Sequence, residues 1–209
     1  MHSESAETEY LDLYWLPVGA GTRFQRASLV LYEALAAALA RRPRTALYHA
    51  ALKFGTDGRA YTLELMPVPA RQDVPPLITG PVGIRGADRV RLFRYQLRSS
   101  ESTTLPDEQW AVDSPVRLAS EATAVRGLVA MASALPAYIW GRRAVGTSEM
   151  WTSNSAISWL LTRIGVSTAE IALPGGGRAP GWLAGIESAR ALAQLQVVQQ
   201  PGRTKPDDC

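Results

Sequence analysis

Three side chains of this chain have the types needed for nucleophilic catalysis. Ser155 offers a hydroxyl, His49 is the one histidine away from the N-terminus, and Glu64 offers a carboxylate. Acyl transfer of the Ser–His kind needs a base within hydrogen-bond reach of the hydroxyl, and usually a third group that orients the base. These roles predict Ser155 as nucleophile, His49 as base and then acid, and Glu64 as the orienting group.

A helix over residues 150–165 must position the hydroxyl. Apolar residues recur at helical spacing over residues 157–164, which is typical of one buried stripe. Each of residues 152–154 can cap the helix start, and Gly165 suits the position after its end. Ser155 then lies in the first turn, away from the buried stripe, where the helix dipole favours a developing anion. An ordinary capping serine fits the same place.

A β-hairpin over residues 45–66 must position the base and the carboxylate. Its turn signal is Asp57-Gly58, a strong cue for a two-residue loop. The register that follows pairs, on one apolar face, Phe54 with Tyr61, Leu52 with Leu63, and Ala50 with Leu65. His49 and Glu64 then share the polar face as diagonal neighbours. A lone histidine on a strand is otherwise a common surface or structural residue.

Four further residues could bind a substrate near the hydroxyl: Trp151, Asn154, Arg178 and Trp182. The tryptophans could form an apolar wall, or they could belong to the core, where large aromatic residues dominate the buried area. The arginine stands in a glycine- and proline-rich loop over residues 174–182. It could clamp a carboxylate or phosphate, or it could be a solvated arginine of a rigid loop.

Composition narrows the classes of function. Hydrophobic residues make up 46% and charged residues 20% of the 209 positions, as in a globular chain. The net charge of +3 is small, and no basic run is interleaved with aromatic residues, which argues against nucleic acid as a partner. The single cysteine is Cys209, and there are only two histidines, so we expect no metal and no cofactor.

The chain shows no membrane-targeting pattern. Residues 1–9 are acidic and polar, unlike a secretory signal, and the longest apolar run, residues 27–40, is too short to cross a bilayer. We therefore expect a soluble cytoplasmic protein without a transmembrane segment, whose partner is a small-molecule or peptide acyl substrate.

The order of elements predicts an α+β fold. An antiparallel sheet packs against the Ser155 helix and a helix over residues 26–41, in one domain over residues 10–198. Residues 1–9 and 199–209 are expected to be a flexible N-terminus and a disordered tail. The sequence also predicts helices over 121–134 and 183–198, a loop over 67–81, an exposed arginine-rich strand over 89–98 and a mobile connection over 99–114.

Two stretches resemble a known superfamily. Tyr48-His49-Ala50-Ala51-Leu52, its hairpin partner ending at Glu64, and the later Trp151-Thr152-Ser153-Asn154-Ser155 helix start resemble the circularly permuted papain-like proteins. These include NlpC-type peptidases and amidases and the lecithin:retinol acyltransferase-like group. The resemblance implies a histidine strand that precedes the nucleophile helix, and Asn154-Ser155 stands where the family typically has Asn-Cys.

The chain is also similar to bacterial proteins that share the Asn-Ser helix start and the Gly-Arg-Ala-Pro-Gly-Trp loop, for which the resemblance implies no function. The serine matters because a hydroxyl, unlike a thiol, cannot be held ionised by a helix dipole and must lose its proton during attack. Two hypotheses follow. One is a Ser-dependent amidase, peptidase, esterase or acyltransferase, and the other is a catalytically silent papain-like binding or interaction module.

Overall fold

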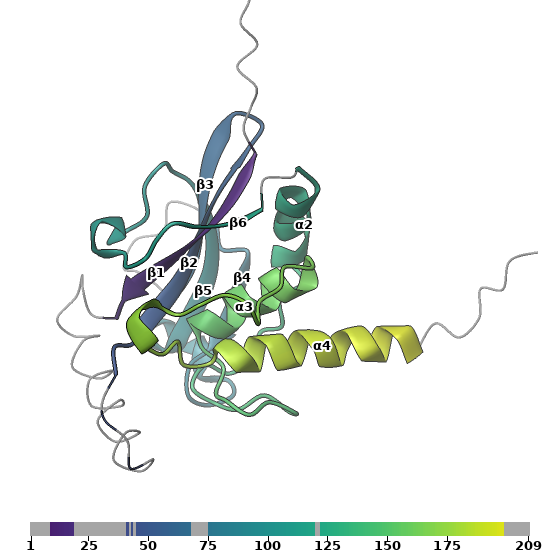
Figure 1. Cartoon of the computed structure of the whole chain (residues 1–209). Helices are drawn as coiled ribbons and strands as arrows, with labels where there is room; N and C mark the ends of the chain where they lie inside the picture. The colour runs from purple at the N-terminus through teal and green to yellow at the C-terminus, as the bar shows by residue number, and fades with distance from the viewer. Residues whose placement is uncertain are drawn as a thin grey trace, which may run out of the picture.

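The protein has an α+β fold, as the sequence predicts. A computed structural model describes residues 9–18, 41, 43, 45–67, 75–119 and 122–198. Within these ranges the protein has three α-helices and a six-stranded antiparallel sheet of order β4-β5-β3-β2-β1-β6 (Figure 1). Two of the helices lie against the sheet, and the third, α4, packs mainly on α3. The strands are β1 (Tyr10–Pro17), β2 (Tyr48–Thr56), β3 (Arg59–Pro67), β4 (Ile78–Pro81), β5 (Arg94–Glu101) and β6 (Val116–Ala119). The helices are α2 (Ala122–Ala132), α3 (Ser153–Arg163) and α4 (Trp182–Val198).

The hairpin of β2 and β3 forms in the predicted register as far as Leu52 and Leu63, and the predicted pair of Ala50 with Leu65 does not form. Leu52 pairs with Leu63, and Thr56 pairs with Arg59 beside the turn. Asp57 and Gly58 both have positive φ, 50° and 70°, which a two-residue turn compatible with the sheet twist requires. The turn residues therefore determine which side chains of the two strands face the helices.

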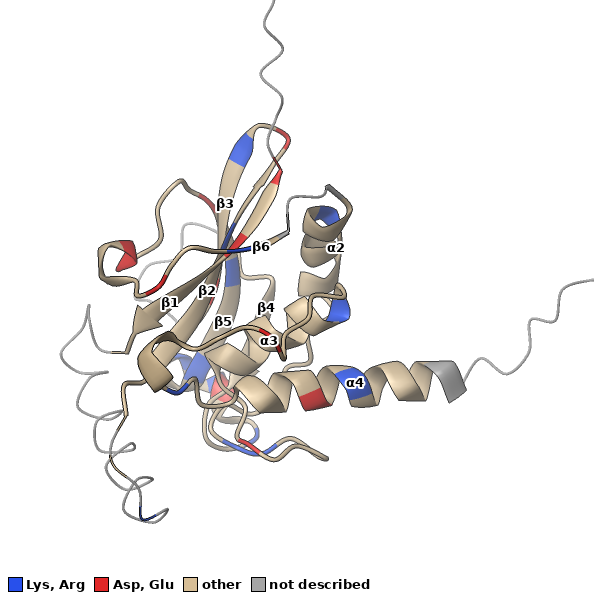
Figure 2. Ribbon diagram, viewed as in Figure 1, with Lys and Arg blue, Asp and Glu red and all other residues tan. Residues whose placement is uncertain are grey.

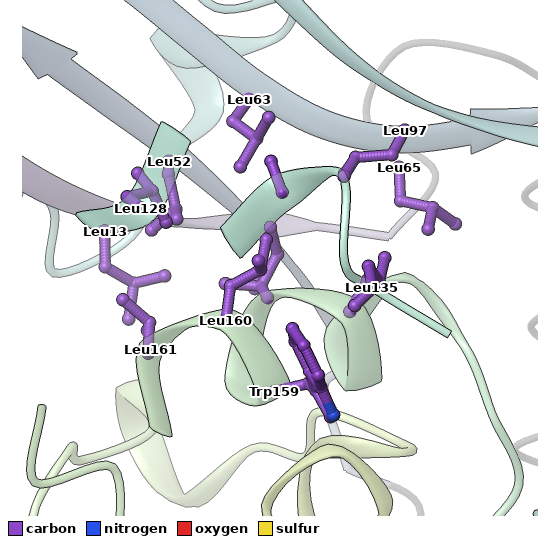
Figure 3. Close-up of a cluster of buried hydrophobic side chains, with 14 of the residues drawn as sticks. Leu13, Leu52, Leu63, Leu65, Leu97, Leu128, Leu135, Trp159, Leu160 and Leu161 are labelled. Atoms are coloured by element: carbon purple, nitrogen blue, oxygen red, sulfur yellow. The ribbon is translucent and has the colours of Figure 1, made fainter. Parts of the chain in front are cut away.

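The main core lies between the sheet and the helices. Leu52 and Leu63 of the hairpin point toward Leu160 of α3, with Leu13 and Leu128 beside them (Figure 3). All five side chains are buried. Burying a leucine completely stabilises a fold by about 1.5–3 kcal/mol relative to leaving it in water. These contacts fix α3 against β2 and so determine where its N-terminus lies.

The opposite face of the sheet is partly covered by the segment between β5 and β6. Leu105 from this segment packs on Tyr14 and Leu16 of β1. Lys53 of β2 forms a 2.9 Å ion pair with Glu108 of the 3₁₀ turn η3 (Glu108–Trp110). The predicted mobile connection is thus, in part, a cover for the outer face of the sheet.

Two predictions near the other edge of the sheet are wrong. The loop expected over residues 67–81 contains β4, in which Gly80 lacks a side chain where the ring of Tyr95 fills the space. The exposed strand expected over residues 89–98 is instead β5, an interior strand with Tyr95, Gln96 and Leu97 buried. Two of the four arginines in residues 89–98 precede β5, in the 3₁₀ turns η1 (Ala87–Arg89) and η2 (Arg91–Phe93), and the other two lie within the strand.

Helices α2 and α4 match the helices expected over residues 121–134 and 183–198. Apart from Arg41, the helix expected over residues 26–41 lies outside the described residues, as do the tail over 199–209 and all but Glu9 of the N-terminal segment. No helix in the described part of the chain is both long enough and apolar enough to cross a membrane.

Candidate functional site

The site lies at the part of β2 that pairs with β1 but no longer with β3. β1 pairs with β2 from Tyr48 to Gly55, whereas the pairing with β3 reaches only from Thr56 to Leu52. Beyond that point the side-chain amide of Asn154 takes the place of a strand. Its Oδ1 accepts a hydrogen bond from the N–H of Ala50 at 2.8 Å, and its Nδ2 donates to the carbonyl of Tyr48 at 3.0 Å. The start of α3 is therefore tied to the edge of β2.

This attachment brings a hydroxyl to the histidine. Oγ of Ser153 lies 2.7 Å from Nδ1 of His49, which is hydrogen-bond distance. Ser153 is the first residue of α3 and is buried, and His49 is half-buried. The serine that contacts His49 is therefore Ser153, two residues before the predicted Ser155.

Ser155 has a different environment from the one the sequence predicts. Its exposed fraction is 0%, and every residue of α3 from Ser153 to Leu161 is buried. Its hydroxyl accepts a hydrogen bond from the N–H of Thr152 at 2.9 Å and donates to the carbonyl of Gly181 at 2.7 Å. The expectation that Ser155 lies away from a buried face is wrong, because α4 covers the side of α3 that the sheet leaves open (Figure 1).

The polar side chains of α3 hold the segment that enters α4. Three consecutive carbonyls of that segment accept hydrogen bonds from α3: Pro180 from Asn154 at 3.1 Å, Gly181 from Ser155 at 2.7 Å, and Trp182 from Ser158 at 2.7 Å. Gly181 has φ +85°, and a Cβ there would collide with the Ser155 hydroxyl. These polar residues therefore contribute to helix packing as well as to the helix start.

Burial changes the protonation of both predicted ionisable groups. Desolvation lowers the pKa of His49 from 6.5 to about 4, so the imidazole is neutral at neutral pH. Desolvation, reinforced by the charge of Asp107, raises the pKa of Glu64 from 4.5 to about 7. Among the described residues, no hydrogen bond joins Glu64 to His49. Glu64 instead stands opposite Arg98 in the β3–β5 register, so the structure gives it no orienting role.

Two of the predicted substrate-binding residues are core side chains. Trp151 is fully buried and stacks edge-on against Tyr138, with ring centroids 4.9 Å apart. Trp182 is buried and lies 5.0 Å from the ring of Trp15. Of the interpretations left open by the sequence, the core role is the one these contacts support.

Arg178 contributes its backbone to the edge of β2. Its N–H donates to the carbonyl of Ala46, and its carbonyl accepts from the N–H of Tyr48, both at 2.8 Å. The loop over residues 174–182 thus continues the edge that Asn154 completes. Its side chain is half-buried.

Sequence reasoning missed Ser153 as the partner of His49. Ser153 was recognised only as one of three possible caps. The sequence carries no signal for this partner, because only the bonds from Asn154 to β2 in the folded protein place Ser153 beside His49. No group of three histidine, cysteine, aspartate or glutamate side chains within the described ranges could hold a metal ion.

The comparisons with known proteins found no match, so the function has to be argued from the geometry of the site. No family model, curated protein or solved structure matches the chain. A hollow of about 870 Å³ lies between β6 and the segment that follows α3, and none of the predicted site residues lines it.

Proposed function

We propose that the protein is an acyl-processing enzyme, an amidase, peptidase, esterase or acyltransferase, in which Ser153 is the nucleophile and His49 is the base. The observation that carries this proposal is the 2.7 Å contact between Ser153 Oγ and His49 Nδ1. A serine hydroxyl is a weak nucleophile at neutral pH and needs an adjacent base to take its proton. Within the described part of the chain, Ser153 is the hydroxyl that contacts an imidazole.

A neutral imidazole at His49 can accept and return the proton that this reaction moves. With its ring proton on Nε2, His49 accepts the Ser153 proton at Nδ1 while Oγ forms a bond to the acyl carbon. His49 then returns that proton to the leaving amine or alkoxide as the acyl bond breaks, which leaves an acyl-serine ester. Water or an acceptor alcohol or amine attacks this ester by the reverse sequence. The lowered pKa keeps His49 ready to accept a proton at neutral pH, although it makes the base weaker.

The helix start supports the charge that develops in this reaction. The first N–H groups of an α-helix have no acceptor within the helix. In the described part of the chain, no residue accepts a hydrogen bond from the N–H of Ser153 or Asn154. Donors at this position suit the tetrahedral oxyanion formed at Ser153, and the helix dipole adds to their effect.

The chain order also suits this proposal. His49 on a strand precedes the helix that begins at Ser153, as the resemblance to permuted papain-like proteins implies. We extend that resemblance to the fold, with a serine in place of the thiol. The nucleophile in this proposal lies just before the Asn154-Ser155 pair that the resemblance points to.

One observation favours a second candidate, a catalytically silent binding or interaction module. Ser153 is 7% exposed, so an acyl group could reach Oγ only after a local rearrangement. The polar residues after it are already used in bonds to β2 and to the segment before α4. In this alternative, the hydroxyl–imidazole contact is one more structural bond.

An acyl-substrate screen on matched variants separates the two candidates. We expect turnover of aryl ester, thioester or amide substrates by wild type, loss of at least about a hundredfold in Ser153→Ala and His49→Ala, and retention in Ser155→Ala wherever that variant is folded. The rate should decrease as the pH is lowered towards 4, because His49 becomes protonated there. Equal rates in Ser153→Ala and wild type would overturn the proposal.

A further inference from the structure

Two loops at one end of the sheet lie against each other. The first, residues 82–94, joins β4 to the start of β5, and the second, residues 140–149, precedes α3. The N–H of Gly83 donates to the carbonyl of Trp140 at 2.9 Å, and Arg142 Nε donates to the carbonyl of Gly83 at 2.7 Å. Figure 1 shows both loops below α4. We call these two segments the paired loops.

The paired loops expose apolar side chains to water. Half of the ten large apolar side chains that are exposed among the described residues are here: Ile84 at 63%, Val90 at 55%, Leu92 at 81%, Phe93 at 47% and Val145 at 99%. Single exposed apolar residues are ordinary on a protein surface. A gathering of five on two adjacent loops marks an interaction site.

The same loops hold the positive charge of the molecule. They contain six arginines and two acidic residues, whereas the whole chain has 22 basic and 19 acidic residues. The rest of the chain is therefore nearly neutral, with 16 basic and 17 acidic residues. Arg85, Arg89 and Arg143 are exposed, and Figure 2 shows arginines on the loops below α4. Exposed cationic and apolar side chains thus occur together on the same two loops.

We propose that the paired loops dock the protein on an anionic lipid surface. Apolar tips such as Leu92 and Val145 enter the boundary between headgroups and acyl chains, and the arginines bind the phosphates and carboxylates of the headgroups. A lipid surface accepts separate apolar tips without a shaped cavity for each. Nucleic acid fits less well, because aliphatic side chains offer nothing on which a base can stack, and Phe93 is the one exposed aromatic residue of the loops.

The paired loops and the Ser153–His49 contact are neighbouring sites, and lipid docking does not depend on acyl transfer. The N–H of Trp151 donates to the carbonyl of Arg142 at 2.8 Å, and Ser153 follows two residues later. Docking by the paired loops therefore places the start of α3 close to the lipid surface.

Vesicle sedimentation tests the proposal with the full chain. We expect binding to vesicles of phosphatidylcholine mixed with phosphatidylserine, little binding to phosphatidylcholine alone, and weaker binding at higher salt. Arg85→Gln with Arg89→Gln should weaken binding by about fivefold per arginine, and the matching lysine variants should restore it. Leu92→Ser with Val145→Ser should weaken it by at least about tenfold.

Control variants carry the same chemical changes elsewhere on the surface. Val129→Ser with Leu195→Ser removes two exposed apolar side chains from α2 and α4, and Arg59→Gln with Arg126→Gln removes two exposed charges. These variants should bind like wild type. The proposal is overturned by no binding of wild type to anionic vesicles, by equal losses in loop and control variants, or by retention on single-stranded nucleic acid without vesicle binding.

Discussion

Ser153 and His49 are separated by 104 positions in sequence, yet their side chains meet at 2.7 Å. The contact exists because Asn154, the next residue, bonds the backbone of β2 on both sides of His49. A hydroxyl at a helix start and a neutral imidazole on a strand are thereby held together by residues that also stabilise the fold. Replacing individual residues of this turn should therefore change activity and stability to different extents.

The two serines of the first turn of α3 should differ in their effect on stability. Ser155→Ala leaves the buried N–H of Thr152 without a partner and removes the shorter of two hydrogen bonds to the carbonyl of Gly181, so it should lower the free energy of unfolding by about 1–3 kcal/mol. Ser153→Ala should cost less, about 0.5–1.5 kcal/mol, because the one hydrogen bond that it removes joins the imidazole of His49 and not a backbone group. Urea denaturation measures both, and a greater cost for Ser153→Ala would contradict this assignment.

Asn154 should be among the most costly polar residues to replace. Asn154→Ala leaves the N–H of Ala50 and the carbonyl of Tyr48 unpaired at the edge of β2, and should destabilise the protein by about 2–5 kcal/mol. Gln196→Ala is the matched control, because this exposed amide on α4 accepts a hydrogen bond from Arg163, and no other side-chain bond to it occurs among the described residues. Thermal denaturation should show a large shift for the first variant and almost none for the second. Similar shifts in both would refute the role of the amide as a strand substitute.

The stability of the protein should fall between pH 4.5 and 7 because of Glu64. Its pKa is about 7 in the folded protein against 4.5 for an ordinary glutamate, so the folded state retains a proton between these values. The stabilisation is present below pH 4.5 and is lost as the pH rises through 7. Glu64→Gln removes this titration, so between pH 5 and pH 8 it should gain about 1–3 kcal/mol relative to wild type. A constant difference across that range would mean that Glu64 is ionised when folded.

Close packing of α3 on α4 should be sensitive to a single methyl group. A Cβ at Gly185 would collide with the backbone carbonyl of Ser155 and the hydroxyl of Ser158, so Gly185→Ala should destabilise by at least about 1–3 kcal/mol. Gly127→Ala in α2 is the control. Its Cβ would lie 3.5 Å from Ile164, an ordinary contact, and alanine favours the helix by about 0.5–1 kcal/mol. Opposite signs in the two denaturation midpoints are expected, and equal losses would contradict the packing.

Local signals predicted the hairpin and the helix correctly. Asp57-Gly58 determines the turn, and a two-residue loop leaves one register for β2 and β3. The helix at residues 153–163 follows from its apolar spacing, its cap and the glycine after its end, where Gly165 has φ +86°. These features depend on neighbours in sequence, so they can be read without the fold.

The details of the site depend on tertiary structure. The apolar stripe of α3 predicted a solvent-facing side for Ser155, but α4 buries that side as well. The predicted diagonal contact between His49 and Glu64 requires β2 and β3 to stay paired to their ends. They separate beyond Leu52 and Leu63, and β3 continues beside β5. No pattern within either strand indicates where a partner is lost.

Covalent labelling of Ser153 tests the central claim most directly. The full chain is incubated with a small fluorophosphonate and, in parallel, with an activated aryl ester, and the modified peptide is located by mass spectrometry. The structure predicts an adduct on Ser153 that Ser153→Ala and His49→Ala abolish and that folded Ser155→Ala retains. An adduct on Ser155, or no adduct on Ser153 with either reagent, would contradict the Ser153–His49 pair as a catalytic site.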